Sequence, residues 1–505
     1  MDRRQFIRCT AVAAVPAALA GCGASMPTVS RQPRPEDALL DAFGVDGRGL
    51  ARVLETLGRN GADFGEVFFQ HHRERQLRAV DGQLLSAKNG SIQGAGLRVV
   101  RNGESGFAVA ESLDEATLRA AAGTASDSLS AGEARAASAA VITTTPDRYG
   151  VERPWSEVLV RRRYDIVDQL DTLVRQADSA VTATEILLTD VDDEVLIARL
   201  DGRIVADRRP MTRLSVQVSI REAGTTHTGF ASLSGRHGDS YFTQERLGSL
   251  AGDAVRRTRQ LFEARTPPAG ELPVVLAAGA SGVVIHETLG HALEADLVVN
   301  GSSRYRDAIG DAIASAELTV IDDPTLPGER GSLNVDDEGE PAERRVLVEA
   351  GTLRSFVQDR ASAAALGSTV AGNGRRESYR HAPIPRMSNT YIDNGSHEPD
   401  ELLDAMDRGI IAETYTGGGV DTRTGRFRFR VRNGWYVENG QRRVPVRDFE
   451  ISGTGPELLQ GVSMVANDRR MDAAGWTRGK NGQTVPVSHG MPSVLVDSLG
   501  VRPLS

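Results

Sequence analysis

The chain has 505 residues, enough for two to four domains at roughly 100–200 residues each, which excludes a peptide hormone or a lone binding motif. Hydrophobic residues make up 40% and charged residues 25%, as in ordinary soluble globular proteins, so wholesale disorder is excluded. The formal net charge of -9 leaves no basic excess to neutralise phosphates, and we therefore expect no nucleic-acid partner.

Residues 1–21 have the pattern of an export signal. Arg3 and Arg4 precede an apolar stretch from Ala11 to Ala20 that is too short to span a bilayer. The paired arginines resemble a twin-arginine signal, and the letters LAGC ending at Cys22 resemble a bacterial lipobox. We expect a protein that is exported and held at the cell envelope, on its periplasmic or outer-surface side, by a lipid on Cys22. The alternatives are a simple N-terminal membrane anchor and an ordinary cleaved signal.

The two cysteines of the chain both lie in this leader region. Cys9 would leave with the signal and Cys22 would carry the lipid, so the mature domains contain no thiol. A disulfide or a thiolate metal ligand is therefore excluded. Residues 22–35, rich in Pro, Ser and small residues, are typical of a flexible tether.

Hydrophobic periodicity then predicts three folded units. The first, residues 36–130, has a helical run at 47–58 and an apolar strand at 66–70. The second, residues 150–265, has a helix over 165–180 followed by strands through 190–219.

The third predicted unit, residues 266–505, begins after a Pro-rich boundary at 266–270. It opens with a strand at 272–277 and a helical run, and then shows short alternating strands with Asn-Gly turns at 432–434 and 438–440. The pattern indicates an α+β protein: a mixed helix and strand N-terminal region precedes a β-rich C-terminal region.

The most informative motif lies in the helical run of this third unit, where two histidines flank a carboxylate. His286 and His291 would hold a metal while Glu287 takes a proton from a water, as in zinc hydrolases. The spacing is H-E-x-x-x-H, so on a regular helix the two imidazoles would point roughly 140° apart. A single π-type turn would bring them to roughly 50°, and Gly290 weakens the regular helix at that point. The alternative is a pair of partly buried histidines on an apolar helix.

The surrounding sequence resembles the TldD/PmbA family of metallopeptidases. The matching segments occur in the family's order and begin with the stretches around Val67 and Gly94, followed by residues 286–296, 334–339, 372–379, 385–391, 417–422 and 463–468. The H-E-x-x-x-H motif is that of the TldD-like, catalytic-type members. The resemblance implies a zinc ion held by His286 and His291, Glu287 as general base, and peptidase activity on small or unfolded peptides. It also implies a dimer, formed with a second copy or with a PmbA-like subunit.

One position departs from the family pattern. Family members supply a third metal ligand from a cysteine in a C-G-K-x-G-Q motif, and the matching residue here is Arg478, which cannot replace a thiolate. We expect His489 to be the third ligand, provided that the strands flanking the intervening turn pair; the alternative is an exposed loop histidine. Asp468 and Asp472 are weaker candidates. A second hypothesis is a non-catalytic peptide-binding or partner subunit that has lost the metal.

Two further groups of polar residues lie in the third unit. Arg375, Arg376, Tyr379 and His381 form a cationic and hydroxyl group in a Gly-Asn-Gly loop, suited to binding substrate or stabilising an oxyanion. A salt-bridged surface is the alternative for that group. Asp336, Asp337 and Glu338 are typical of a turn with solvated carboxylates rather than a calcium site.

Overall fold

The computed structural model describes residues 40–504 except residues 371 and 422. The predicted signal, the lipidated Cys22 and the tether therefore lie outside the described residues. Between residues 40 and 504, no helix is both long and apolar enough to cross a membrane.

The N-terminal half is built on one seven-stranded sheet with the order β3-β2-β1-β5-β6-β4, to which β7 adds beside β6. Its long antiparallel strands carry most of the pairing; for example, β1 pairs with β5 from Glu66 to Val80. The strands are β1 (Phe64–Val80), β2 (Gln83–Arg101), β3 (Glu104–Ala110), β4 (Val141–Ile142), β5 (Val181–Arg199), β6 (Arg203–Glu222) and β7 (Thr225–Gly235). Both predicted N-terminal units thus contribute strands to a single sheet.

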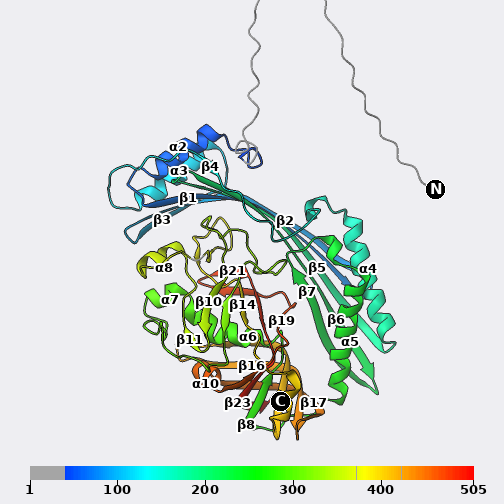
Figure 1. Cartoon of the computed structure of the whole chain (residues 1–505). Helices are drawn as coiled ribbons and strands as arrows, with labels where there is room; N and C mark the ends of the chain where they lie inside the picture. Colours follow the sequence, from blue (N-terminus) through cyan, green and yellow to red (C-terminus); the bar gives the residue numbers. More distant parts are fainter. Residues whose placement is uncertain (1–39, 371, 422, 505) are drawn as a thin grey trace, which may run out of the picture.

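Two separate helix pairs cover the two ends of this sheet (Figure 1). The helices α2 (Gly47–Leu57) and α3 (Glu115–Asp127) bury one apolar core, around residues such as Leu57 and Phe69. The helices α4 (Val160–Ala177) and α5 (Gln244–Glu263) bury another, around residues such as Leu170 and Val216. A strand of this length spans about 55 Å, so one helix pair cannot cover it and two cores form.

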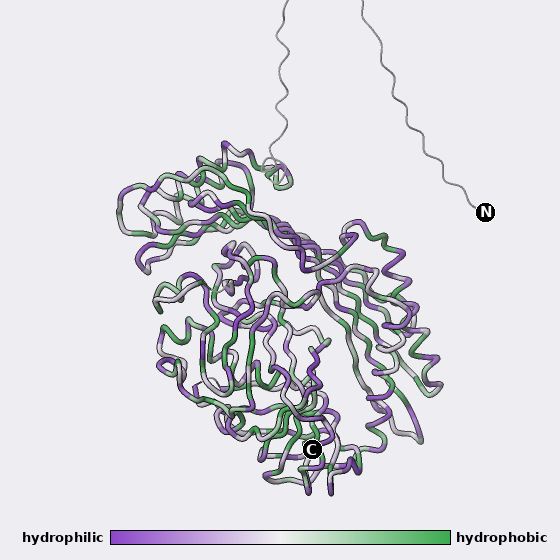
Figure 2. The backbone as a smooth tube through the Cα atoms, in the orientation of Figure 1, coloured by the Kyte–Doolittle hydropathy of each residue, from purple (hydrophilic) through white to green (hydrophobic). Residues whose placement is uncertain are grey.

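The C-terminal half contains two six-stranded sheets around the largest apolar core. Figure 2 shows the hydrophobic trace concentrated in the strands near the C-terminus. One sheet contains β8 (Gly270–Leu276), β15 (Arg408–Val420), β16 (Arg426–Glu438), β17 (Gln441–Thr454), β18 (Val462–Val465) and β23 (Val494–Pro503). The other contains β9 (Val320–Asp322), β10 (Arg345–Glu349), β11 (Thr352–Leu353), β14 (Asn389–Ile392), β19 (Arg470–Met471) and β22 (Ser488–Met491).

Short elements complete this half. Two ribbons pair β12 (Gly374–Arg375) with β13 (Ile384–Pro385), and β20 (Thr477–Lys480) with β21 (Gln483–Pro486). Short helices of this half include α7 (Ala295–Val299), α8 (Arg360–Ala365), α9 (Pro399–Asp404) and α10 (Gly455–Gln460). The N-terminal half also contains the short helices η1 (Trp155–Glu157) and η2 (Asp239–Tyr241). The α+β class is confirmed.

Local predictions from the sequence have mixed outcomes. The helix at 47–58 and the turn at 438–440 are confirmed; Asn439 and Gly440 both have positive φ, as a tight hairpin turn requires. The turn predicted at 432–434 is wrong, because these residues lie inside β16. A Cβ at Gly434 would lie 2.3 Å from the carbonyl oxygen of Ile411, so this glycine allows close strand packing.

A buried layer of alternating charges joins the two halves; we call it the charge layer and define it as Glu66, Arg98, Arg209, Asp337, Glu338 and Arg376. Arg98 pairs with Glu338, Arg209 with Asp337, and Arg376 with Glu66. All six side chains are buried. The prediction of solvated carboxylates at 336–338 is therefore wrong, because arginines from the N-terminal sheet cover this turn.

Candidate metal centre

The predicted π turn is confirmed. β8 leads into the short helix α6 (Gly282–Ile285), which continues as a π-helical turn η3 (His286–Gly290) and a 3-10 turn η4 (His291–Leu293). Two glycines allow this helix to pack directly on its neighbours. A Cβ at Gly282 would lie 2.6 Å from the backbone nitrogen of Gly490, and one at Gly290 would lie 2.1 Å from Met387 Sδ.

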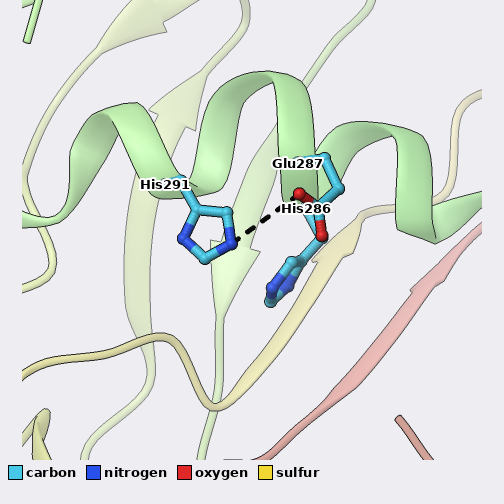
Figure 3. A group of neighbouring side chains, drawn as sticks. All are labelled: His286, Glu287 and His291. Carbon is cyan, nitrogen blue, oxygen red and sulfur yellow. Dashed lines mark ion pairs between the residues drawn. The ribbon is translucent and has the colours of Figure 1, made fainter. Parts of the chain in front are cut away.

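The turn brings the motif's side chains to one place (Figure 3). One ligand atom from each of His286, Glu287 and His291 lies within 4.8 Å of the others. The two imidazole rings are nearly perpendicular, with centroids 5.1 Å apart. Glu287 Oε2 lies 3.9 Å from His291 Nε2. This donor set of nitrogen and oxygen is one that zinc accepts.

His489 joins these residues from the opposite wall. It lies on β22, is fully buried, and its ring centroid is 5.9 Å from that of His286. The route differs from the expected one, because β20 pairs with β21, whereas β22 pairs with β14 and β19 in a different sheet. The alternative of an exposed loop histidine is wrong. We use "histidine cluster" below for His286, Glu287, His291 and His489.

Two of the three imidazoles in this cluster, those of His286 and His489, are fully buried. Both ring nitrogens of His286 and both of His489 are buried without a well-directed hydrogen bond from the described residues. Burial lowers the pKa of both rings, so they are neutral at pH 7 and present free lone pairs. Unsatisfied buried nitrogens are uncommon in native proteins, and a bound cation would satisfy them.

Carboxylates orient two of the three imidazoles. Glu294 Oε2 lies 3.0 Å from His291 Nδ1, which leaves Nε2 facing Glu287. Burial alone would lower the pKa of His291, but Glu294 reverses the effect and raises it. On the other wall, Asp472 Oδ2 lies 3.3 Å from His489 Nε2 and accepts a hydrogen bond from Trp476 Nε1.

Glu294 is itself held by cations. Lys480 Nζ lies 3.1 Å from its Oε2, and Arg386 Nε lies 3.5 Å from its Oε1. Burial opposes ionisation, but His291, Lys480 and Arg386 together lower the pKa of Glu294 to about 2. Glu294 is thus a fixed negative charge beneath His291.

Arg478, at the position where the family pattern has a cysteine, contacts the motif directly. Its Nη1 lies 3.2 Å from Glu287 Oε1, and its guanidinium stacks over the ring of Trp476 with Cζ 4.6 Å from the centroid. Its Nε and Nη2 are buried without a hydrogen-bond partner among the described residues. The side chain therefore brings a positive charge to the carboxylate of the motif.

The second predicted group of residues lies elsewhere. Arg375 donates to the carbonyls of Met387 and Pro486, and Arg376 belongs to the charge layer. Tyr379 donates its hydroxyl to Glu111, and His381 Nδ1 lies 3.2 Å from Ser378 Oγ. No recorded contact of these four side chains reaches the histidine cluster within the described part of the chain. Their predicted role in binding substrate or an oxyanion stays a prediction.

Three residues beside the cluster were missed or underrated from the sequence. Glu294 follows His291 by three residues, a spacing at which helical side chains meet, and this signal could have identified it. The sequence predicted Asp472 only as a weaker candidate ligand and predicted no role for Trp476. Asp472 directly follows β19, which pairs with β22, and the ring centroids of Trp476 and His489 are 5.6 Å apart. No local pattern reveals either contact.

Comparisons with known proteins agree on one family. Three family profiles match in order: PmbA/TldA metallopeptidase domain 1 over residues 65–129, the central domain over 153–262, and the C-terminal domain over 269–502. The chain is 33% identical to the "Metalloprotease TldD homolog" of Haemophilus influenzae over 472 residues, 92% of this chain and 98% of the relative. It is 34% identical to the "Zinc metalloprotease TldD homolog" of Saccharolobus solfataricus over 304 residues, 60% of this chain and 67% of the relative.

Solved structures show the same fold. A proposed DNA gyrase modulator from Thermotoga maritima superposes with a TM-score of 0.74 at 21% identity, covering 90% of this chain and 99% of that one. TldE from Thermococcus kodakarensis gives a TM-score of 0.70 at 18% identity with the same coverage. The family profiles, the match to a relative along nearly the whole chain, and the fold together show that this chain belongs to the PmbA/TldD family of metallopeptidases.

Proposed function

We propose that the protein is a zinc-dependent metallopeptidase that hydrolyses small or unfolded peptides, acting as a dimer. The observation that carries the proposal is the convergence of His286, Glu287 and His291, with the buried His489 beside them. The rings of His286 and His489 have no well-directed hydrogen bond within the described part of the chain. The printed names of the relatives support it, since several are metalloproteases and one is a zinc metalloprotease.

His286, His291 and His489 would hold the metal. Neutral imidazoles are suitable ligands, and the low pKa of His286 and His489 keeps those two rings neutral at pH 7. Zinc in a three-histidine site supplies Lewis-acid chemistry toward a peptide carbonyl. Glu294 and Asp472 orient the imidazoles of His291 and His489, as carboxylates commonly do beside metal ligands.

Glu287 would act as the general base. Its carboxylate lies on the same face of the turn as the two motif histidines, where it can take a proton from the attacking water and return it to the leaving amine. Arg478 Nη1, 3.2 Å from Glu287 Oε1, would hold this carboxylate in position.

A second candidate function is a non-catalytic subunit that binds peptides or a PmbA-like chain. The Arg478–Glu287 ion pair favours it, because a guanidinium beside the motif carboxylate repels a divalent cation and engages the proposed base. The two candidates differ in whether the chain binds zinc and whether Glu287 matters for turnover.

The deciding experiment measures zinc per chain in the full-length protein and in His489→Ala, purified identically and supplied with zinc. We expect about one zinc in the wild type and a loss of about tenfold or more in affinity for the variant. His397→Ala is the matched control, because His397 lies near the surface beside Glu401 and should leave zinc content unchanged. A wild-type chain that binds no zinc would instead support the non-catalytic subunit.

A further inference from the structure

A cavity of about 430 Å³ lies between the N-terminal sheet and the C-terminal half. Its walls come from β1, β5 and β6 on one side, and from the loop at 375–381 and the hairpin β20–β21 on the other. None of its lining residues belongs to the histidine cluster. It is therefore a separate site in the described part of the chain.

Positive charge predominates on the cavity wall, where six arginines face four acidic residues. Three of these arginines have a carboxylate partner: Arg209 pairs with Asp337, Arg376 with Glu66, and Arg380 with Glu111. Those three are neutralised by the protein itself.

The other three arginines, Arg236, Arg330 and Arg375, have no carboxylate within 4.0 Å among the described residues. Their recorded acceptors are neutral. Arg236 donates to the carbonyl of Pro210, with its Nε buried and unpartnered. Arg330 donates to the carbonyl of Trp476 and the hydroxyl of Thr477, and Arg375 donates to two backbone carbonyls.

Arg236 is close enough to repel both Arg330 and Arg375. Burial lowers the pKa of all three. The charges of Arg213 and Arg236 lower that of Arg330 further, to about 10, and Arg236 lowers that of Arg375 to about 9 although Asp337 opposes the shift. They are still protonated at pH 7. Buried like charges without counterions are unfavourable, and a bound anion would relieve this cost.

The acidic residues on the wall act on these arginines only from beyond 4.0 Å: Asp337 on Arg375, Glu74 on Arg330 and Asp193 on Arg236. Asp193 lies 3.3 Å from His72 and accepts from Gln70, and Glu377 accepts from Thr484. Glu74 is exposed and has no recorded ion pair. An anion that enters the cavity would therefore meet guanidiniums that are still available.

The rest of the wall is apolar. Phe68, Ile92, Met211 and Leu333 line the same cavity. A bare inorganic anion would leave these side chains without a partner, whereas an amino acid residue offers both a carboxylate and a hydrocarbon side chain. We propose that this cavity binds the C-terminal residue of a peptide, with its carboxylate on Arg236, Arg330 and Arg375 and its side chain against the apolar wall. The choice of a peptide as ligand rests on the proposed function.

The cavity and the histidine cluster share one structural element, the hairpin β20–β21. Thr477, Thr484 and Pro486 of this hairpin line the cavity, while Arg478 contacts Glu287. Arg330 and Arg375 hold the hairpin through the Trp476 and Pro486 carbonyls at its two ends. A carboxylate bound there would engage the arginines that fix the position of Arg478.

The test is calorimetric binding to the full-length chain in a Glu287→Gln background, so that peptide is not consumed. The probes are acetyl-Ala-Ala-Leu with a free carboxylate, the same peptide with a C-terminal amide, and inorganic phosphate. We expect the free acid to bind at least about tenfold more tightly than the amide, because charge-assisted bonds to guanidinium are strong. Arg330→Gln should remove most of this preference. Arg380→Gln is the matched control, since Arg380 lines the same cavity but is paired with Glu111.

Equal affinity for acid and amide would overturn the proposal, and this comparison needs no variant of the cavity. A preference unchanged in a folded Arg330→Gln variant would overturn it too, as would phosphate binding more tightly than the peptide acid. If hydrolysis depends on Glu287 but acid and amide bind equally, the carboxylate site in the cavity is rejected and the proposed function is kept. If the chain binds the free acid more tightly than the amide but has neither zinc nor turnover, the carboxylate site is kept and the peptidase function is rejected.

Discussion

The histidine cluster and the charge layer both bury titratable side chains, but they satisfy them in opposite ways. In the charge layer each guanidinium meets a carboxylate: Arg98 with Glu338, Arg209 with Asp337, and Arg376 with Glu66. In the histidine cluster the ring nitrogens of His286 and His489 have no well-directed hydrogen bond from the described residues, although Asp472 lies 3.3 Å from His489 Nε2. Glu66 Oε2 and Arg376 Nε lack a hydrogen bond among the described residues, but every charge of the layer faces an opposite charge, which indicates a structural joint. The unsatisfied rings of His286 and His489 instead indicate a site whose partner comes from outside the chain.

The difference also predicts what each region tolerates. Removing one member of a buried ion pair leaves an uncompensated charge, so the charge layer should fail through loss of stability. Changing a cluster residue that the fold does not need should instead remove function and leave the fold intact. Each prediction below tests one side of this contrast.

The largest effect is expected for Glu287→Gln. The substitution keeps the shape of the side chain but removes the proposed base, so kcat on peptides should fall about 10²–10⁴-fold. Zinc content and the urea midpoint should stay near the wild-type values. Glu349→Gln, at an exposed position far from the motif in sequence, is the control. Residual wild-type activity in Glu287→Gln would exclude Glu287 as the base.

Arg376→Met should lower stability without changing zinc binding. It removes the nearest guanidinium of Glu66, with only Arg98 left 4.0 Å away, and a hydrogen bond to the Asp337 carbonyl. We expect a loss of about 3–5 kcal/mol in the free energy of unfolding, measured with urea. Zinc bound per folded chain should not change. The double variant Glu66→Gln with Arg376→Met should recover part of the loss, because it removes both charges. A cost below about 1 kcal/mol would show that the layer does not hold the halves together.

The sequence predicted the local chemistry of the cluster better than its surroundings. The spacing of His286 and His291 required a π turn, and the structure has one, because helix geometry alone decides where the two side chains point. His489 was also predicted to reach this space if the strands flanking the intervening turn pair. These strands, β20 and β21, do pair, but His489 lies beyond them on β22, in a different sheet. Asp472 was predicted only as a weaker candidate ligand, and no role was predicted for Trp476, since both reach the cluster through tertiary contacts.

The charge layer was predicted wrongly for a related reason. Three acidic residues in succession are typical of a solvated turn, and only the tertiary structure brings Arg98, Arg209 and Arg376 over them. The single sheet that runs through the first half of the chain was also not predicted, because its strands pair across long stretches of sequence. Helices such as 47–58 were predictable because their apolar period is local, whereas the partners of a strand are not.

Gly290→Ala should damage the π turn itself. The added Cβ would lie 2.1 Å from Met387 Sδ, so either the methionine or the turn must move. We expect a loss of about 1–3 kcal/mol in the free energy of unfolding and weaker zinc binding. Gly248→Ala is the matched control, because a Cβ there, in α5, meets no atom within 4 Å and should stabilise the helix by roughly 0.5–1 kcal/mol. Wild-type zinc affinity in Gly290→Ala would show that the cluster does not need this close contact.

The smallest expected effect concerns Asp359, which caps α8 at the edge of the charge layer. Burial, and then the negative charge of Glu338, raise its pKa to about 6. The folded state therefore binds a proton more tightly than the unfolded state, so this group lowers stability as pH rises from about 4 to about 6. Asp359→Asn keeps an oxygen that can accept from Ser362 and removes the charge.

The asparagine variant should match the wild type near pH 4 and exceed it at pH 7 by on the order of 1–2 kcal/mol, measured by urea unfolding at both values. Asp114→Asn is the control at another helix cap, in α3. Hydrogen bonds from Thr117 lower the pKa of Asp114 to about 2, so its own contribution is lost only below about pH 4. The free energy of unfolding could instead change equally with pH in Asp359→Asn and in the wild type. That result would mean that Arg98 already neutralises Asp359, so that pairing in the charge layer extends to its edge.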